Sequence, residues 1–84
     1  MAYHLHFVPY RRSTEVVLSL SRGDGLGAPV DQRVWPNWVE LIRALSTVLA
    51  EPERMKAKAK LAAGRAHLLP NVRLTDRDLD ALGF

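Results

Sequence analysis

Two short runs of alternating apolar and polar residues open the chain, and only five residues separate them. Residues 3–8 and 14–21 each place apolar side chains at every second position, which is the period of a half-buried β-strand. The spacer, residues 9–13, has the length of a hairpin loop. The sequence therefore predicts an N-terminal β-hairpin.

A glycine-rich segment, residues 23–29, follows the hairpin and is typical of a flexible connector. Gly23, Gly25 and Ala28 also satisfy the G-x-G-x-x-A spacing of a dinucleotide fingerprint, but Pro29 and the residues after it supply no helix to receive a phosphate. A connecting loop is therefore the preferred interpretation. Residues 30–34 have the composition of a short third strand.

The apolar period then changes to the three- and four-residue spacing of one helical face. Asn37 and Glu40 have capping-box spacing, so we expect the main core helix to begin there and to reach Leu49. Pro52 suits the first turn of a second helix, which we expect to extend to Leu68.

A third, short helix is predicted over residues 76–82. Thr75 and Asp78 have the spacing of a capping box, and Gly83 fits a glycine stop. The predicted fold class is α+β: an N-terminal hairpin with a possible short third strand, packed on two helices, with a short C-terminal helix. The whole chain, residues 1–84, is expected to form one small globular domain.

Composition places the chain among ordinary globular proteins, with 48% hydrophobic and 25% charged residues. It contains no cysteine, which excludes disulfides and thiolate metal sites. Residues 1–10 do not resemble a signal peptide, and no apolar run is long enough to span a bilayer. We therefore expect a cytoplasmic location with no membrane partner.

The net charge of +3 is unevenly distributed, because residues 54–73 contain six Lys and Arg residues and no Asp or Glu. On a helical wheel the basic side chains form two stripes that point in nearly opposite directions, with apolar arcs between them. One stripe contains Arg54, Lys58 and Arg65, and the other contains Lys56, Lys60 and His67. We expect the alanine-rich arc to pack on the core. The arc of Leu61 and Leu68 is then left for the C-terminal helix, a second subunit or a partner.

Two further groups are candidates for partner contact. Tyr10, Arg11 and Arg12 lie at the predicted hairpin tip, and Trp35 is expected at the surface because Trp38 belongs to the helical core face. The full set of predicted partner-binding residues is Tyr10, Arg11, Arg12, Trp35, Arg54, Lys56, Lys58, Lys60, Leu61, Arg65 and Leu68.

His4 and His6 share one face of the first strand and have a spacing that can hold a metal, with His67 as a conceivable third ligand. No Cys, Asp or Glu is placed beside them by the sequence, so an exposed polar strand face is the preferred interpretation and no metal is predicted. No nucleophile or cofactor motif is present either, and we expect a non-enzymatic protein without a cofactor.

The leading functional hypothesis is a small accessory protein that binds another protein with an acidic or mixed surface. Composition and size are those of many phage and mobile-element proteins, including inhibitors of host defence complexes. The alternative is a nucleic-acid-associated protein in which one basic stripe of the second helix tracks phosphates. A purely solvated lysine face and a homo-oligomer both stay open.

Overall fold

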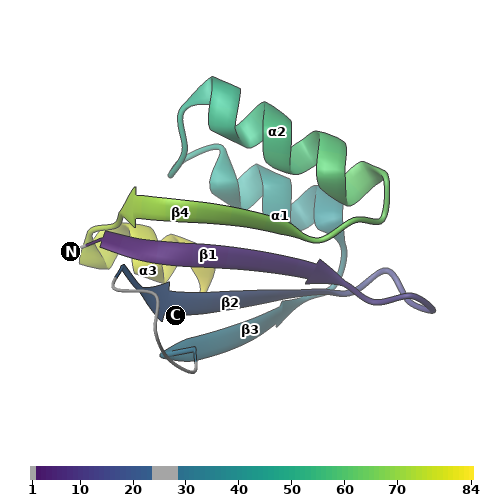
Figure 1. The fold of residues 1–84 in the computed structure, drawn as a ribbon, viewed down its shortest axis with the longest axis horizontal. Coiled ribbons are helices and arrows are strands. Elements are labelled where there is room, and N and C mark those ends of the chain that lie inside the picture. Colours follow the sequence, from purple (N-terminus) through teal and green to yellow (C-terminus); the bar gives the residue numbers. More distant parts are fainter. Residues whose placement is uncertain (1, 24–28) are drawn as a thin grey trace.

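A four-stranded antiparallel sheet forms one layer of the protein in the computed structural model, which describes residues 2–23 and 29–84 (Figure 1). The strand order is β3-β2-β1-β4, and every neighbouring pair is antiparallel. The strands are β1 (Ala2–Pro9), β2 (Val16–Arg22), β3 (Asp31–Trp35) and β4 (His67–Arg73). The predicted hairpin, β1 with β2, thus forms the centre of the sheet.

Three helices make up the rest of the regular structure: α1 (Trp38–Leu45), α2 (Glu51–Ala62) and α3 (Asp76–Leu82). In Figure 1, α1 and α3 lie behind the sheet, while α2 runs alongside the outer strand β4. α2 packs against both α1 and β4. Within the described residues no helix covers the front face of the sheet. The predicted α+β class is confirmed, including the third strand and the short C-terminal helix.

The core lies between the rear face of the sheet and the helices. Alternation in the hairpin turns Leu5, Phe7 and Leu18 to this side, and each is fully buried. α1 adds Leu41 and Leu45, four residues apart on one helical face. The remaining buried apolar residues are Val16, Leu20, Ala57, Leu61, Leu69, Leu74 and Leu82.

Both predicted N-caps are confirmed. Asn37 Oδ1 accepts a hydrogen bond of 2.9 Å from the backbone N–H of Glu40 at the start of α1. At α3, Thr75 Oγ1 accepts from the Asp78 N–H at 3.2 Å while Asp78 Oδ2 accepts from the Thr75 N–H at 2.9 Å. This reciprocal pair is a complete capping box, and Gly83 closes the helix with a φ of 90°.

α1 ends at Leu45, four residues before the predicted Leu49. The hydroxyls of Ser46 and Thr47 donate to the carbonyls of Arg43 and Ala44, at 2.6 and 2.9 Å. Such local side-chain bonds compete with continued helix, which explains the early end.

The second predicted helix is wrong in its extent. α2 begins beside Pro52 as expected, but it ends at Ala62 instead of Leu68. Gly64 has a φ of 70°, its N–H donates to Leu61, and the Arg65 N–H donates back to Lys60 at 2.9 Å. This paired pattern is a Schellman stop, which glycine permits because it tolerates the left-handed conformation.

The residues after this stop form β4, a strand that the sequence analysis missed. β4 pairs with β1 so that His67 lies opposite Phe7 and Leu69 lies opposite Leu5. Pro70 is tolerated because β4 is an edge strand, where a missing N–H need not break a ladder. The predicted connector was placed over residues 23–29, of which residues 24–28 lie outside the described part of the chain.

Candidate functional site

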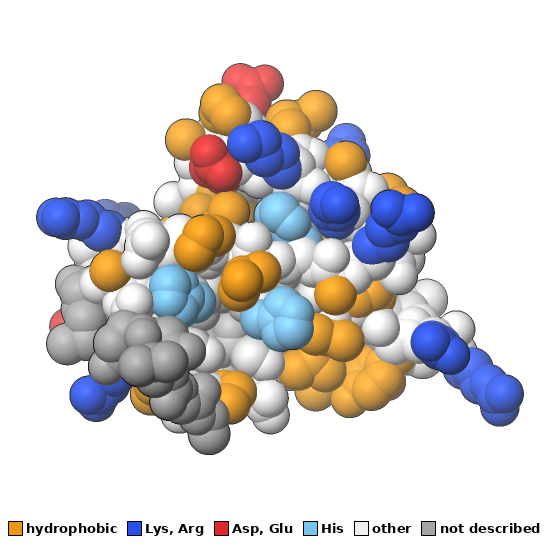
Figure 2. Space-filling view, in the orientation of Figure 1, with side chains coloured by type: hydrophobic (Ala, Val, Ile, Leu, Met, Phe, Trp, Pro, Cys, Tyr) orange, Lys and Arg blue, Asp and Glu red, His pale blue; other side chains and the backbone are white. Residues whose placement is uncertain are grey.

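Among the described residues, no helix covers the front face of the sheet. Strand alternation and cross-strand register place one set of side chains on it, which we call the open face. These residues are His4, His6, Val8, Val17, Ser19, Ser21, Gln32, Val34 and Leu68. None of them is Asp, Glu, Lys or Arg. Figure 2 looks onto this side and shows hydrophobic and histidine side chains in its middle with Lys and Arg side chains around the margin.

Three apolar side chains of the open face are strongly exposed. Leu68 is 56% exposed, Val34 46% and Val8 38%. Val8 and Val34 lie opposite Val17 in the register, so the three valines form a row across β1, β2 and β3. Apolar groups gathered in one patch, unlike scattered ones, mark interaction sites.

A polar row lies beside the valines. Gln32 Nε2 donates a hydrogen bond to Ser19 Oγ at 3.1 Å. Ser19 is buried in the middle of the sheet, so this bond gives its hydroxyl a hydrogen-bond partner. His6 pairs with Ser19 on one side and with Leu68 on the other. The open face therefore combines hydrogen-bonding and apolar groups without any Asp, Glu, Lys or Arg.

The structure does not bring the three histidines together on one face of the sheet. The Asn71 backbone N–H donates to His4 Nδ1 at 3.1 Å, so in the neutral ring the proton is on Nε2, the nitrogen that would have to bind a metal. His67 stacks on Phe7 instead, with ring centroids 6.0 Å apart and an interplanar angle of 15°. Phe7 belongs to the core, so His67 is on the other side of the sheet from His4 and His6. In the described ranges no group of three potential metal ligands is found.

His67 has an unusual environment of its own. Burial lowers its pKa from the ordinary 6.5, and the nearby charge of Lys60 lowers it further. Glu53 acts in the opposite direction, and Lys56 adds to the lowering. Its Nε2 is buried and has no hydrogen-bond partner among the described residues. The ring is thus held neutral between β4 and α2.

The hairpin tip joins one end of the open face. Tyr10, Arg11 and Arg12 are all exposed, and with Ser13 and Glu15 they line a shallow cavity of about 410 Å³. The Tyr10 N–H donates to the Glu15 carbonyl at 3.0 Å, which closes the loop. Behind it, Thr14 Oγ1 donates to the Pro36 carbonyl at 2.8 Å and ties the base of the tip to the segment before α1.

The lysines of α2 are exposed, as predicted. The apolar arc that α2 buries, however, is the one with Leu61 and not the alanine-rich arc that was expected to pack on the core. Lys56, Lys58 and Lys60 are exposed, as is Arg65 beyond the helix, whereas Arg54 is half-buried. Leu61 is 2% exposed and belongs to the core together with Ala57. The prediction that Leu61 faces a partner is therefore wrong, and the alanine-rich arc around Met55 faces solvent.

Trp35 offers less surface than the sequence analysis assumed. It is half-buried against the core, and its Nε1 is buried without a partner in the described residues. The Arg33 guanidinium carbon lies 4.6 Å from the Trp35 ring centroid, in cation–π geometry. A partner would have to displace Arg33 to reach that side of the ring.

The structure brings some of the predicted contact residues together and separates others. His67 at the start of β4 lies opposite Phe7 near the end of β1, so Arg65 and Lys60 lie at the same end of the sheet as the hairpin tip. Leu68 joins the open face from β4. Sequence reasoning missed the open face as a unit, although the alternation of His4, His6 and Val8 indicated its central strand.

No protein-family model matches the chain, and neither the curated proteins nor the solved structures contain a significant match. Among the described residues, no helix has both the length and the apolar character needed to cross a membrane.

Proposed function

We propose that the protein is a non-catalytic binding module that docks on another protein through its open face, with an acidic rim on the partner facing the hairpin tip. The proposal rests on the contrast between the open face, which contains no Asp, Glu, Lys or Arg, and the Lys and Arg side chains around it (Figure 2). Protein interfaces have this organisation, with a charge-depleted centre and a polar rim.

The exposed apolar side chains of the open face supply apolar contact. Val8, Val34 and Leu68 are exposed on a sheet whose backbone is already paired, so little conformational entropy is lost when a partner covers them. Valine and leucine side chains are branched and populate few rotamers. This favours a rigid partner surface of complementary shape.

The basic residues at the hairpin-tip end of the sheet would orient the partner. Arg11 and Arg12 project from the hairpin tip, and Lys60 and Arg65 lie at the same end of the sheet. Clustered rim charges accelerate association with an oppositely charged surface and set its direction. The acidic or mixed partner expected from the sequence fits this arrangement.

A protein partner accounts for the open face better than a nucleic acid does. Sheets that bind single strands use aromatic side chains as stacking platforms, and the open face contains no Phe, Tyr or Trp and only the smaller rings of His4 and His6. Tyr10 is exposed, but it lies beyond the sheet at the hairpin tip. A role as an inhibitor of a host complex is a further part of the proposal, which a named partner would test.

The experiment is affinity capture from the native host lysate, nuclease-treated and untreated in parallel, with variants of the bait. Leu68→Glu and Arg11→Glu should each lose the captured protein, because the first places a charge among the apolar side chains of the open face and the second reverses a charge of the rim. Arg43→Glu is the matched control, since Arg43 is exposed on α1 behind the sheet. A protein that binds all four baits equally, or recovery of nucleic acid alone, would contradict the proposal.

A further inference from the structure

β3 forms one outer edge of the sheet, and among the described residues nothing pairs with its outer side. Figure 1 shows α2 alongside β4 at the opposite edge, whereas no described helix or strand lies beyond β3. Four consecutive residues of this strand, Asp31, Gln32, Arg33 and Val34, are exposed. The outer side of an edge strand presents backbone N–H and C=O groups that can pair with a strand of another chain.

The hydrogen bonds show which backbone groups of β3 face outward. The Gln32 N–H donates at 2.8 Å to Asp31 Oδ1, a side chain of its own strand, and so belongs to the outer side. The bond from the Tyr10 N–H to the Glu15 carbonyl fixes the same alternation through β2. The even-numbered residues of β3 therefore direct their backbone groups outward, and the odd-numbered residues direct theirs to β2.

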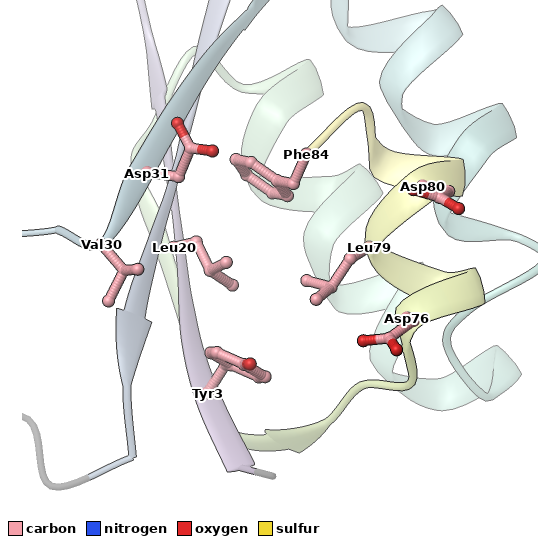
Figure 3. A pocket seen from close by; sticks show the side chains of 8 residues that line it. All are labelled: Tyr3, Leu20, Val30, Asp31, Asp76, Leu79, Asp80 and Phe84. Carbon is pink, nitrogen blue, oxygen red and sulfur yellow. The ribbon is translucent and has the colours of Figure 1, made fainter.

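Two opposite charges lie along this edge, on the core side of the sheet. Asp31 pairs with Leu20 and Arg33 pairs with Leu18, both of which are buried, so the two charged side chains leave β3 on the same side. Figure 3 shows Asp31 on the side of the strand that faces Phe84. β3 contains no other charged residue.

An antiparallel second copy of β3 matches these charges in one register. When Gln32 lies opposite Gln32 of the copy, Asp31 lies opposite Arg33, and two-fold symmetry repeats this favourable contact. A shift of one residue would pair outward with inward backbone groups. A shift of two residues would place Asp31 opposite Asp31 or Arg33 opposite Arg33, which is unfavourable. The edge is therefore complementary to itself.

We propose that the protein forms a two-fold homodimer by antiparallel pairing of β3 with β3 of a second copy. The Gln32 N–H leaves Asp31 and donates to the Gln32 carbonyl of the copy. The freed Asp31 carboxylate pairs with the Arg33 guanidinium of the copy. The Val34 N–H donates to the Val30 carbonyl of the copy, and the exposed side chains of these two valines meet across the pair. The two four-stranded sheets become one sheet of eight strands.

The test is sedimentation equilibrium of the purified full chain over a series of concentrations. Pairing of two five-residue strands buries less surface than a standard interface, so we expect a dimer with a Kd of about 10 to 100 µM. Hydrogen exchange of the Gln32 and Val34 amides should slow as the protein concentration rises, because both N–H groups enter the ladder. A protein that stays monomeric at about 1 mM would overturn the proposal.

Charge reversals make the test specific. Asp31→Arg and Arg33→Asp should each weaken self-association about tenfold or more, because like charges then face each other twice in the dimer. An equimolar mixture of the two variants should associate as well as the unaltered protein, since each chain offers the charge that the other lacks. Lys58→Asp, which reverses an exposed charge on α2 at the other edge of the sheet, should change nothing.

Thermal melts confirm that each variant is folded. Dimers that survive both single reversals, or a mixture of folded variants that does not associate, would overturn the proposal. Self-association is measured on the purified chain alone, so this proposal and docking through the open face can fail separately.

Discussion

The backbone N–H of Asn71 donates a hydrogen bond to Nδ1 of His4, 3.1 Å away across the β1–β4 pair. The contact occurs where the register between these strands shifts, and Asn71 there has a φ of 54°. An extra residue in β4 is thus accommodated as a bulge whose free N–H is satisfied by a side chain of the open face. His4, which the sequence suggested as a possible metal ligand, therefore stabilises the bulge in β4.

His4→Ala should destabilise the protein by about 1 kcal/mol, because it leaves the Asn71 N–H without its acceptor. Asn71→Gly should be nearly neutral, since glycine tolerates positive φ, whereas Asn71→Val should cost about 1 to 2 kcal/mol. Urea unfolding monitored by fluorescence would measure all three. Equal effects of the glycine and valine variants would show that the positive φ is not maintained in solution.

Gly64→Ala and Gly83→Ala should both destabilise the fold, the second more strongly. Each glycine has a positive φ, which costs about 1 kcal/mol or more for alanine. A Cβ at Gly64 would meet nothing within 4 Å, whereas a Cβ at Gly83 would also contact the Arg33 side chain and force it to move. Unfolding free energies in the reverse order would contradict the close approach of the Arg33 side chain to Gly83.

Acidification should destabilise the protein through His67. Its folded pKa lies below the unfolded value of about 6.5, so the unfolded state binds the proton more readily and stability decreases as the pH is lowered through 6.5. The loss should level off below the folded pKa. His67→Phe, which keeps an aromatic ring beside Phe7, should flatten this part of the profile, while His6→Gln should retain it. Urea midpoints measured from pH 7.5 to 5 compare the three proteins, and parallel profiles would exclude His67 as the cause.

Trp35→Ala should lower stability by about 2 to 4 kcal/mol, because the ring packs against the core and carries the Arg33 contact. Its effect on partner binding should follow from this loss of stability. Arg11→Glu, in contrast, should weaken binding while changing the free energy of unfolding by no more than about 0.5 kcal/mol. The comparison requires thermal melts of both variants. A fully stable Trp35→Ala that no longer binds would restore Trp35 as a contact residue.

The local signals in the sequence predicted much of the fold. Alternation predicted the hairpin, and the polar residues at Asn37 and Thr75 predicted where two helices begin, because each cap is a short-range interaction. The end of α2 was missed although Gly64 was visible as a stop, since Leu61 and Leu68 fit one helical face across it. Pro70 further hid β4, because proline argues against a strand unless the strand is known to be at an edge.

The residues of the candidate surface could not be predicted from local sequence patterns alone. α2 has two apolar arcs, and only tertiary packing determined that Ala57 and Leu61 are buried while Met55 is exposed. Leu68 was correctly expected at the surface, but on a helix and not on a sheet. Without β4, the open face had no fourth strand and was not apparent as a single surface.

The most direct test of the open face as a docking surface is methyl NMR of the ¹³C-labelled protein titrated with the captured partner. The account predicts that the largest shifts occur at the methyl groups of Val8, Val34 and Leu68, with smaller changes at the Leu41 and Leu45 methyls in the core. Shifts confined to the Met55 side of α2 or to the α3 residues, with the valine and Leu68 signals unchanged, would contradict it.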